Sequence, residues 1–354
     1  AQENVSLNRK EVPMKKLLFA LVATTGLATA AHAEGELNIY NWVEYTSPEM
    51  IAKFEKETGI KVNIDTYDTN ETLLAKLKAG GTGYDIVVPS QHFVEILVKE
   101  GLLAETGVGQ MSTYANVDAR WQKPDWDPEA KYCAPWQWGT ASIAYRKDLY
   151  GKELTSLKEF FEPEEAMKGK IQVFKSPDEV YNMANLYLDK PFCSESAEDA
   201  KAVQALFEGQ KPFVVTYNSE NQNDNLANGT AVIANNWNGF SMRARMDSKT
   251  DIVYAYPKEG VVGWFDSACV PVGAKNPDNA KKFLEFIMKP ENIGLQSNYA
   301  RYSNAIVGSE PFMDKDLAGA DELKVPESVP VKFGKACSPA AQKLTDRVWT
   351  KLLQ

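Results

Sequence analysis

Several short stretches of the sequence place aromatic or acidic side chains in turns beside apolar segments. These side chains are Trp42, Glu44, Tyr45, Ser90, Glu179, Trp237, Trp264, Asp266 and Tyr302. A charge-assisted hydrogen bond to a carboxylate contributes on the order of 1.5–3 kcal/mol, and a desolvated cation–π contact adds about 2 kcal/mol. Acids separated by aromatic walls therefore predict a concave site for a linear diamine or triamine, with one carboxylate for each end.

The histidine content excludes most nucleophilic and metal-dependent chemistry. The chain has two histidines, and His32 falls in a predicted leader, which leaves His92 alone. A single histidine removes most Ser-His-acid and Cys-His schemes and every site that needs two histidines, and we expect no catalysis, no cofactor and no metal. A secreted hydrolase that uses Glu179 and Asp266 as a carboxylate pair is the enzymatic alternative. His92 itself is expected to be a solvated residue in the first turn of a helix.

The first part of the chain, residues 1–33, has the pattern of a leader extension and a secretory signal peptide. Met14-Lys15-Lys16 is the charged start, residues 17–22 are the apolar centre, and Ala31-His32-Ala33 is a small-x-small cleavage site. The apolar centre is too short for a permanent membrane anchor, and no cysteine follows the cleavage site. We therefore expect a soluble periplasmic protein that begins at Glu34, and we leave the origin of residues 1–13 open.

Charge and cysteine usage limit the partners further. The chain has 39 Lys and Arg against 48 Asp and Glu, a formal net charge of −9, which disfavours nucleic acid and favours cationic partners. Cys133, Cys193, Cys269 and Cys337 lie far apart without CxxC spacing. In an oxidising compartment they predict one or two disulfides, and three complete pairings remain open.

The elements that must position these side chains alternate between strands and helices. The predicted order begins with strand 36–41, helix 48–57, strand 61–67, a helix capped by Asn70, strand 85–88 and a helix from residue 91. Three such units predict a mostly parallel sheet covered by helices. Ligands of open α/β sheets lie at the carboxyl ends of the strands, where Trp42 and Ser90 fall.

A second α/β segment follows an irregular region at 105–135. Its predicted elements are strand 141–145, helix 156–161, strand 171–174, a helix from 177, helix 196–208, strands 213–217, 231–234, 252–256 and 268–272, and helices at 276–290 and 338–353. Trp264 and Asp266 are thus placed in the turn before a strand. Ser176 and Glu179 have the spacing of a capping box. A chain of this length suits two lobes better than one core.

Four segments resemble the periplasmic spermidine/putrescine-binding proteins of ABC importers. They are residues 37–45, 84–90, 237–239 and 257–267, and their order and spacing match over essentially the whole mature chain. The resemblance implies an α/β, two-lobed periplasmic binding protein fold, in which each lobe is a mixed sheet flanked by helices and the ligand cleft lies between the lobes. Lobe 1 is expected to comprise 34–140 and 266–310, and lobe 2 is expected to comprise 141–265 and 311–354.

The same resemblance implies a function without catalysis. A monomer would capture putrescine or spermidine by hinge closure and deliver it to an inner-membrane ABC permease. The ligand-binding positions of the family map onto all of the side chains named at the start, with Tyr302 a better match than Tyr299.

Four departures from the family pattern leave the ligand open. Ser176 stands where the spermidine-binding branch has a second acid, His92 where it has an aromatic residue, and Phe240 where the putrescine-binding branch has an acid. Lys335 falls near a ligand-contacting glutamine. A lysine that faces an amine would repel it, so either Lys335 points away or the ligand is another amine-bearing or zwitterionic solute whose acidic group Lys335 would bind.

Overall fold

The computed structural model describes residues 35–80 and 83–354, so the predicted leader and signal peptide, residues 1–33, lie outside the described residues. The strands are β1 (Glu36–Trp42), β2 (Lys61–Tyr67), β3 (Ile86–Val87), β4 (Cys133–Arg146), β5 (Ile171–Val173), β6 (Val214–Tyr217), β7 (Ile233–Trp237), β8 (Ile252–Ala255), β9 (Val261–Cys269) and β10 (Val331–Phe333). Within this part of the chain they form one sheet in the order β2-β1-β3-β9-β4-β7-β5-β6, with β10 beside β9 and β8 beside β4.

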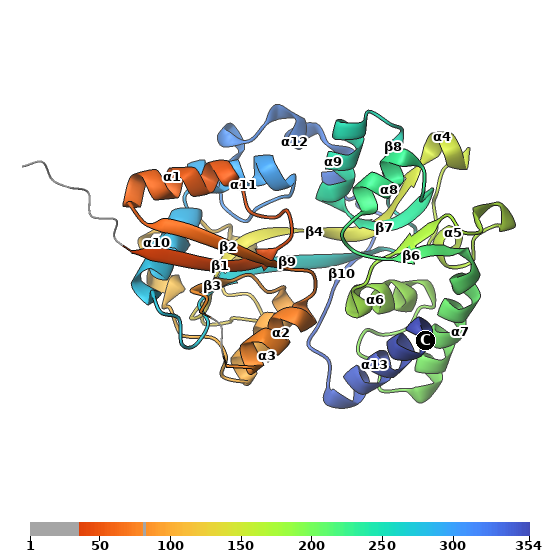
Figure 1. Cartoon of the computed structure of the whole chain (residues 1–354), viewed down its shortest axis with the longest axis horizontal. Helices are drawn as coiled ribbons and strands as arrows, with labels where there is room; N and C mark the ends of the chain where they lie inside the picture. Colours follow the sequence, from red (N-terminus) through yellow and green to blue (C-terminus); the bar gives the residue numbers. More distant parts are fainter. Residues whose placement is uncertain (1–34, 81–82) are drawn as a thin grey trace, which may run out of the picture. The chain divides into compact units, whose positions relative to one another are not determined.

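The two ends of this sheet are parallel, and two long antiparallel strands connect them. β1 pairs in parallel with β2 and β3, as the three successive strand–helix units predict. β5 pairs in parallel with β6 and β7 at the other end. β9 pairs antiparallel with β3 and β4, and β4 pairs antiparallel with β7. Figure 1 shows β4 and β9 running between the two groups of strands, so the two ends belong to one continuous sheet.

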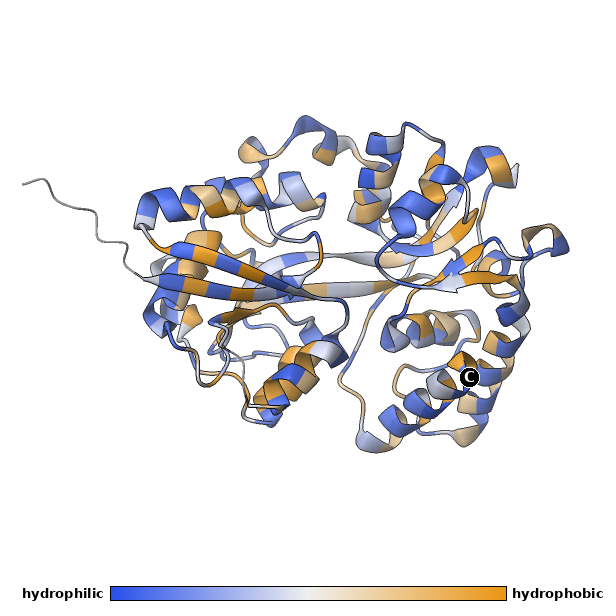
Figure 2. Cartoon of the chain, viewed as in Figure 1, coloured by the Kyte–Doolittle hydropathy of each residue, from blue (hydrophilic) through white to orange (hydrophobic). Residues whose placement is uncertain are grey.

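Helices cover both ends of the sheet (Figure 1). They are α1 (Pro48–Thr58), α2 (Asn70–Lys78), α3 (Gln91–Lys99), α4 (Lys147–Tyr150), α5 (Lys158–Phe161), α6 (Pro177–Tyr187), α7 (Ala197–Gln210), α8 (Gln222–Asn228), α9 (Asn238–Ser248), α10 (Pro277–Ile287), α11 (Pro290–Ala300), α12 (Lys315–Gly319) and α13 (Pro339–Leu353). Along many of them hydrophilic and hydrophobic bands alternate, which is the pattern of a helix with one face against a sheet (Figure 2). Across residues 35–80 and 83–354, none of the helices combines the length and apolarity that a membrane crossing needs.

Local capping explains where the first helices begin. The Ser47 hydroxyl accepts a bond from the Met50 backbone N–H at 3.2 Å, and Pro48 occupies the first turn of α1. α2 is capped by Thr69 and not by Asn70, which corrects the sequence-based prediction. The physical reason is that Asn70 lies in the first turn and its buried amide bonds Ser90 instead.

The strand β9 corrects a second prediction. Trp264 and Asp266 lie in the middle of β9, which begins at Val261, and not in a turn before a strand at 268–272. All nine residues of β9 are buried because the strand is covered on both faces. Gly263 and Asp266 interrupt its apolar run, so the sequence resembles a turn although the backbone is extended.

The cysteines form two disulfides, which settles the pairing that the sequence left open. Cys133–Cys269 joins β4 to β9. Cys193–Cys337 joins the loop between α6 and α7 to the segment before α13. Each disulfide joins two segments that are more than a hundred residues apart in the sequence.

Candidate functional site

A cavity of about 890 Å³, counting the space that opens to solvent, lies where the turns after β1, β3, β5 and β7 meet the middle of β9. The structure brings all of the side chains that the sequence singled out to this one cavity: Trp42, Glu44, Tyr45, Ser90, Glu179, Trp237, Trp264, Asp266 and Tyr302. That they share a cavity is an observation, whereas their contact with a ligand is a prediction.

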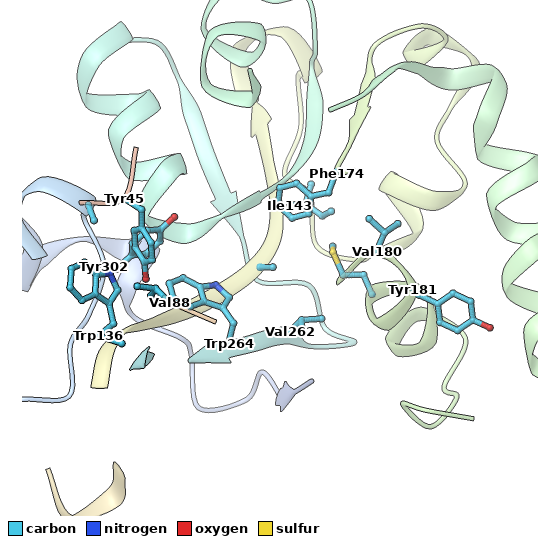
Figure 3. Packing of buried hydrophobic residues seen from close by; sticks show 14 of the residues in the cluster. Tyr45, Val88, Trp136, Ile143, Phe174, Val180, Tyr181, Val262, Trp264 and Tyr302 are labelled. Atoms are coloured by element: carbon cyan, nitrogen blue, oxygen red, sulfur yellow. The ribbon is translucent and has the colours of Figure 1, made fainter. Parts of the chain in front are cut away.

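One wall of the cavity is built from Trp42 and a cluster of three aromatic rings. The ring centroid of Tyr302 lies 4.8 Å from that of Trp264 and 5.6 Å from that of Tyr45, in edge-on arrangements (Figure 3). Trp42 is held by a bond from its Nε1 to the Val88 carbonyl at 2.9 Å. Trp264 Nε1, a buried polar atom of this wall, has no hydrogen-bond partner among the described residues, so a polar ligand could satisfy it. The Tyr45 hydroxyl lies against Asp266 and favours the ionised form of that carboxyl.

Two glycines leave room for these rings. A Cβ at Gly139 would lie 2.6 Å from Trp264 Cζ2, and one at Gly239 would collide with the Tyr302 ring. Both glycines follow a tryptophan by one or two positions in the sequence. The wall therefore depends on close approach of the backbone at these two points.

The opposite aromatic wall is formed by Trp237 at the end of β7. Its ring stacks on Phe174, with centroids 4.3 Å apart and an interplanar angle of 24°. Its Nε1 donates to Glu179 Oε1 at 2.7 Å. The Phe174 stack and this bond fix the indole face toward the cavity, where Phe240 also lies.

Asp266 is the acid of the first wall. It lies in β9 opposite Gln137 of β4, and its Oδ1 accepts the Ser90 hydroxyl at 2.7 Å. Ser90 is held in turn by the Asn70 amide, whose Nδ2 donates to Ser90 Oγ at 3.1 Å. Burial raises the pKa of Asp266 to about 7, and the Ser90 bond opposes that rise. Among the described residues, no Lys, Arg or His side chain forms a salt bridge with this carboxyl, although His92 lies close enough to favour its ionised form.

Glu179 is the acid of the second wall, in the first turn of α6. Burial, and then the neighbouring Asp178, raise its pKa to about 8, although the Trp237 bond favours the ionised form. The predicted capping box is wrong, because Ser176 makes no side-chain cap bond and its hydroxyl donates to Asp178 Oδ1 at 2.6 Å. Glu179 is therefore free of a capping role and faces the cavity.

Three ion pairs join the β1–β3 end of the sheet to the β5–β7 end across the cavity. They are Glu44–Arg243 (3.2 Å), Asp68–Lys175 (3.9 Å) and Asp178–His92 (2.7 Å). His92 was expected to be solvated, and this expectation is wrong: its side chain is 11% exposed and lines the cavity. Burial disfavours the Asp178 carboxylate, but the bonds from His92 and Ser176 outweigh that effect and lower its pKa.

Glu44 differs from the other predicted acids. Its backbone has a φ of +53°, and its side chain is 56% exposed at the edge of the cavity. Arg243 binds both its carboxylate and its backbone carbonyl at 3.2 Å. The negative charge of Glu44 is therefore already balanced by a protein cation.

Lys335, which the sequence left with two orientations, does not line the cavity. It is exposed, whereas the preceding Gly334 lines the cavity and accepts a bond from Gln91 Nε2 at 3.1 Å. Of the two competing tyrosines, Tyr302 lines the cavity and Tyr299 does not. The described residues that line the cavity therefore include no lysine.

Sequence reasoning missed several lining residues, among them Tyr67, Asn70, Asp178, Asn182 and Gly334. Asp178 could have been found from its place beside Glu179 in a helical first turn, and Asn70 from its place at a helix start. Gly334 carries no local signal, because it reaches the cavity from a distant segment. In the part of the chain that the structure describes, no group of His, Cys, Asp or Glu side chains is placed to hold a metal ion.

Two groups of parallel strands joined by long crossing strands, with a cavity of acids and aromatic rings between them, define a solute-binding protein. The family model for bacterial extracellular solute-binding proteins matches residues 49–317, and the chain belongs to this family. The putrescine-binding periplasmic protein PotF of Escherichia coli is 31% identical over 362 residues, which cover 96% of this chain and 98% of that protein. The spermidine/putrescine-binding periplasmic protein of Salmonella typhimurium is 35% identical over 332 residues, covering 91% and 93%.

Solved structures agree with these relatives. A structure described as a spermidine/putrescine ABC transporter from Listeria monocytogenes has a TM-score of 0.84 and 26% identity, and it covers 90% of this chain and 99% of its own. The resemblance inferred from the sequence and the two-lobed α/β fold are thereby confirmed. The exact division of residues between the lobes stays a prediction. A protein with bound agropinic acid, 18% identical, shares the fold at a TM-score of 0.72, so the fold alone does not choose the ligand.

Proposed function

We propose that this protein captures a polyamine, putrescine or spermidine, in the cavity and delivers it to an inner-membrane ABC permease. The observation that carries the proposal is a pair of carboxyls on two aromatic walls, the buried Asp266 and the half-buried Glu179. Both have neutral hydrogen-bond donors as partners, and neither has a positively charged salt-bridge partner among the described residues. Burial raises the pKa of both, an effect that a nearby positive charge would oppose. The ammonium groups of a polyamine would provide that charge, and its methylenes would lie against the rings.

The proposal includes the cellular setting and the motion. The protein acts as a periplasmic monomer without catalysis, and hinge movement closes the two lobes over the ligand. The three ion pairs across the cavity support a closed arrangement, since each joins one end of the sheet to the other. The names of the relatives support the choice of ligand and of the transporter.

The placement of the basic residues argues against the zwitterionic alternative. A carboxylate or phosphonate ligand needs a cation that faces the cavity. Lys335 lies outside the lining, and Arg243 and Lys175 are each paired with an acid. The hydrolase alternative has no observation in its favour beyond the two carboxyls, which an amine ligand explains as well.

Thermal-shift measurements with putrescine, spermidine, an amino acid and a phosphonate test the proposal. Polyamine at a hundred times its dissociation constant should stabilise the protein by about 2.7 kcal/mol. Asp266→Asn keeps the shape of the side chain but removes its charge, and it should weaken polyamine binding at least about tenfold. Asp125→Asn, at an exposed acid outside the cavity, is the matched control and should bind as the wild type does.

Two results would contradict the proposal. One is a response to the amino acid or the phosphonate with none to either polyamine. The other is an unchanged polyamine affinity in Asp266→Asn, which would remove the site assignment even if a polyamine binds.

A further inference from the structure

His92 and Asp178 form an ion pair inside the cavity, where a ligand would otherwise find a carboxylate. His92 is the second residue of α3 and Asp178 is the second residue of α6, so the pair spans the two ends of the sheet. His92 Nε2 lies 2.7 Å from Asp178 Oδ2, and the two side chains are 11% and 16% exposed. The other oxygen of Asp178 accepts the Ser176 hydroxyl. Both oxygens of this carboxylate are therefore occupied by protein donors.

The other acids of the cavity divide into those that have a basic partner and those that do not. Glu44 is paired with Arg243 and Asp68 with Lys175. Glu220 is exposed at the rim. The remaining two are the half-buried Glu179, whose hydrogen-bond partner is an indole N–H, and the buried Asp266, whose partner is a hydroxyl. The cavity therefore offers two carboxyls to the cations of a ligand.

We propose that His92 is a specificity-determining residue: by holding Asp178 and filling the space beside it, His92 restricts the site to linear diamines and disfavours triamines. This inference rests on the proposed function, since it concerns which polyamine the same cavity takes. A third ammonium in the closed cavity would lose its water and find no further carboxylate, because Asp178 is covered by His92 and Ser176. A cation–π contact alone would offset only part of that loss. A buried charge without a partner is strongly disfavoured, so the discrimination comes from the missing partner and not from size alone.

The test compares putrescine with spermidine by isothermal titration calorimetry at pH 8. The wild type should bind putrescine at least about tenfold more tightly than spermidine, the factor that corresponds to one unsatisfied buried group. His92→Ala exposes Asp178 and opens space beside it, so the ratio should move toward spermidine by at least about tenfold.

The double variant His92→Ala/Asp178→Asn separates charge from space. It keeps the opened space but removes the carboxylate, and the gain for spermidine should disappear. If His92→Ala does not fold, His92→Leu serves instead, because it fills much of the same space but cannot donate a hydrogen bond to Asp178, and it should shift the ratio in the same direction.

The outcomes distinguish this inference from the proposed function. A wild type that binds neither polyamine overturns both. A wild type that binds polyamines but prefers spermidine, or a ratio that His92→Ala and His92→Leu leave unchanged, overturns the role of His92 alone. A gain for spermidine that persists in the double variant also overturns it, because the effect would then come from space and not from Asp178.

Discussion

The affinity of the cavity for a diamine should rise as the pH rises from 6 to 8. Burial raises the pKa of Asp266 to about 7 and that of Glu179 to about 8 in the empty cavity. At pH 6 both carboxyls are therefore mostly protonated, whereas an ammonium group binds the ionised form. Aliphatic ammonium groups keep their charge over this range, since their pKa is near that of lysine, about 10.4. Binding must therefore release protons, and it becomes easier as the pH rises.

The size of the effect follows from the two pKa values. The factor by which protonation weakens binding is one plus ten raised to the difference between pKa and pH. For Asp266 this factor falls from about 11 at pH 6 to about 1.1 at pH 8, a tenfold gain in affinity. For Glu179 it falls from about 100 to about 2, a gain of about fiftyfold. If both carboxyls ionise fully in the complex, the combined gain is on the order of five-hundredfold, which is an upper limit.

The stability of the empty protein should change in the opposite direction. Both carboxyls have a folded-state pKa above their unfolded values of about 4, so the folded protein binds more protons than the unfolded chain between about pH 4 and 8. The stability that these protons contribute is fully present below about pH 4 and is lost as the pH rises through about 7 and 8. Stabilisation by a diamine should consequently be larger at pH 8 than at pH 6.

Isothermal titration calorimetry with putrescine at pH 6, 7 and 8 checks the affinity, and repeating it in buffers of different ionisation enthalpy counts the protons released. Glu179→Gln removes one titrating group, so the remaining gain should fall to about tenfold. Asp125→Asn, at an exposed acid outside the cavity, should keep the wild-type profile. An affinity that is equal at pH 6 and 8, or proton uptake on binding, would refute the reasoning.

Two further predictions concern the fold around the cavity. Both carboxylate oxygens of Glu71 are buried without a hydrogen-bond partner among the described residues, and burial, and then Asp178, raise its pKa to about 8. The unfolding free energy measured in urea titrations should thus fall between pH 5 and 8, and this fall should be smaller in Glu71→Gln. A fall of the same size in Glu71→Gln and in the wild type would contradict the raised pKa of Glu71. Removing the Cys193–Cys337 disulfide, which spans 144 residues, should lower the unfolding free energy by at most about 5 kcal/mol. An unchanged urea midpoint in the double serine variant would contradict that pairing.

The strands and helices near the start of the chain could be predicted because their determinants are local. Ser47 caps the helix that Pro48 begins, as their order in the sequence indicates. Strand β3 could be found from its continuous apolar run before Pro89. The position of Asp266 in a strand could not be found in this way, since a strand buried on both faces has no alternation and a polar residue within it looks like a turn.

The electrostatic arrangement of the cavity depends on contacts that leave no local pattern. His92 and Asp178 are 86 residues apart, and Glu44 and Arg243 are 199 apart. The acids of the cavity could therefore be predicted from the sequence, because each follows a strand or lies in one. The sequence could not show which of these acids form ion pairs with basic residues of the protein. Glu44 was predicted as a ligand acid, and the Arg243 contact is the reason that we now assign it a weaker role than Asp266 or Glu179.

The charge balance of the cavity connects ligand capture to closure. The three ion pairs join the two ends of the sheet, so in the proposed closure they would form as the lobes close and would balance Glu44, Asp68 and Asp178. The same closure would remove water from Asp266 and Glu179, which have no salt-bridge partner among the described residues, and burial raises the pKa of both carboxyls. An empty protein must therefore close with these carboxyls protonated or remain open. With a diamine bound, its two ammonium groups would allow both carboxyls to be ionised in the closed state. The lack of a basic partner for these two carboxyls thus explains why closure would favour a cationic ligand and why the affinity for that ligand should depend on pH.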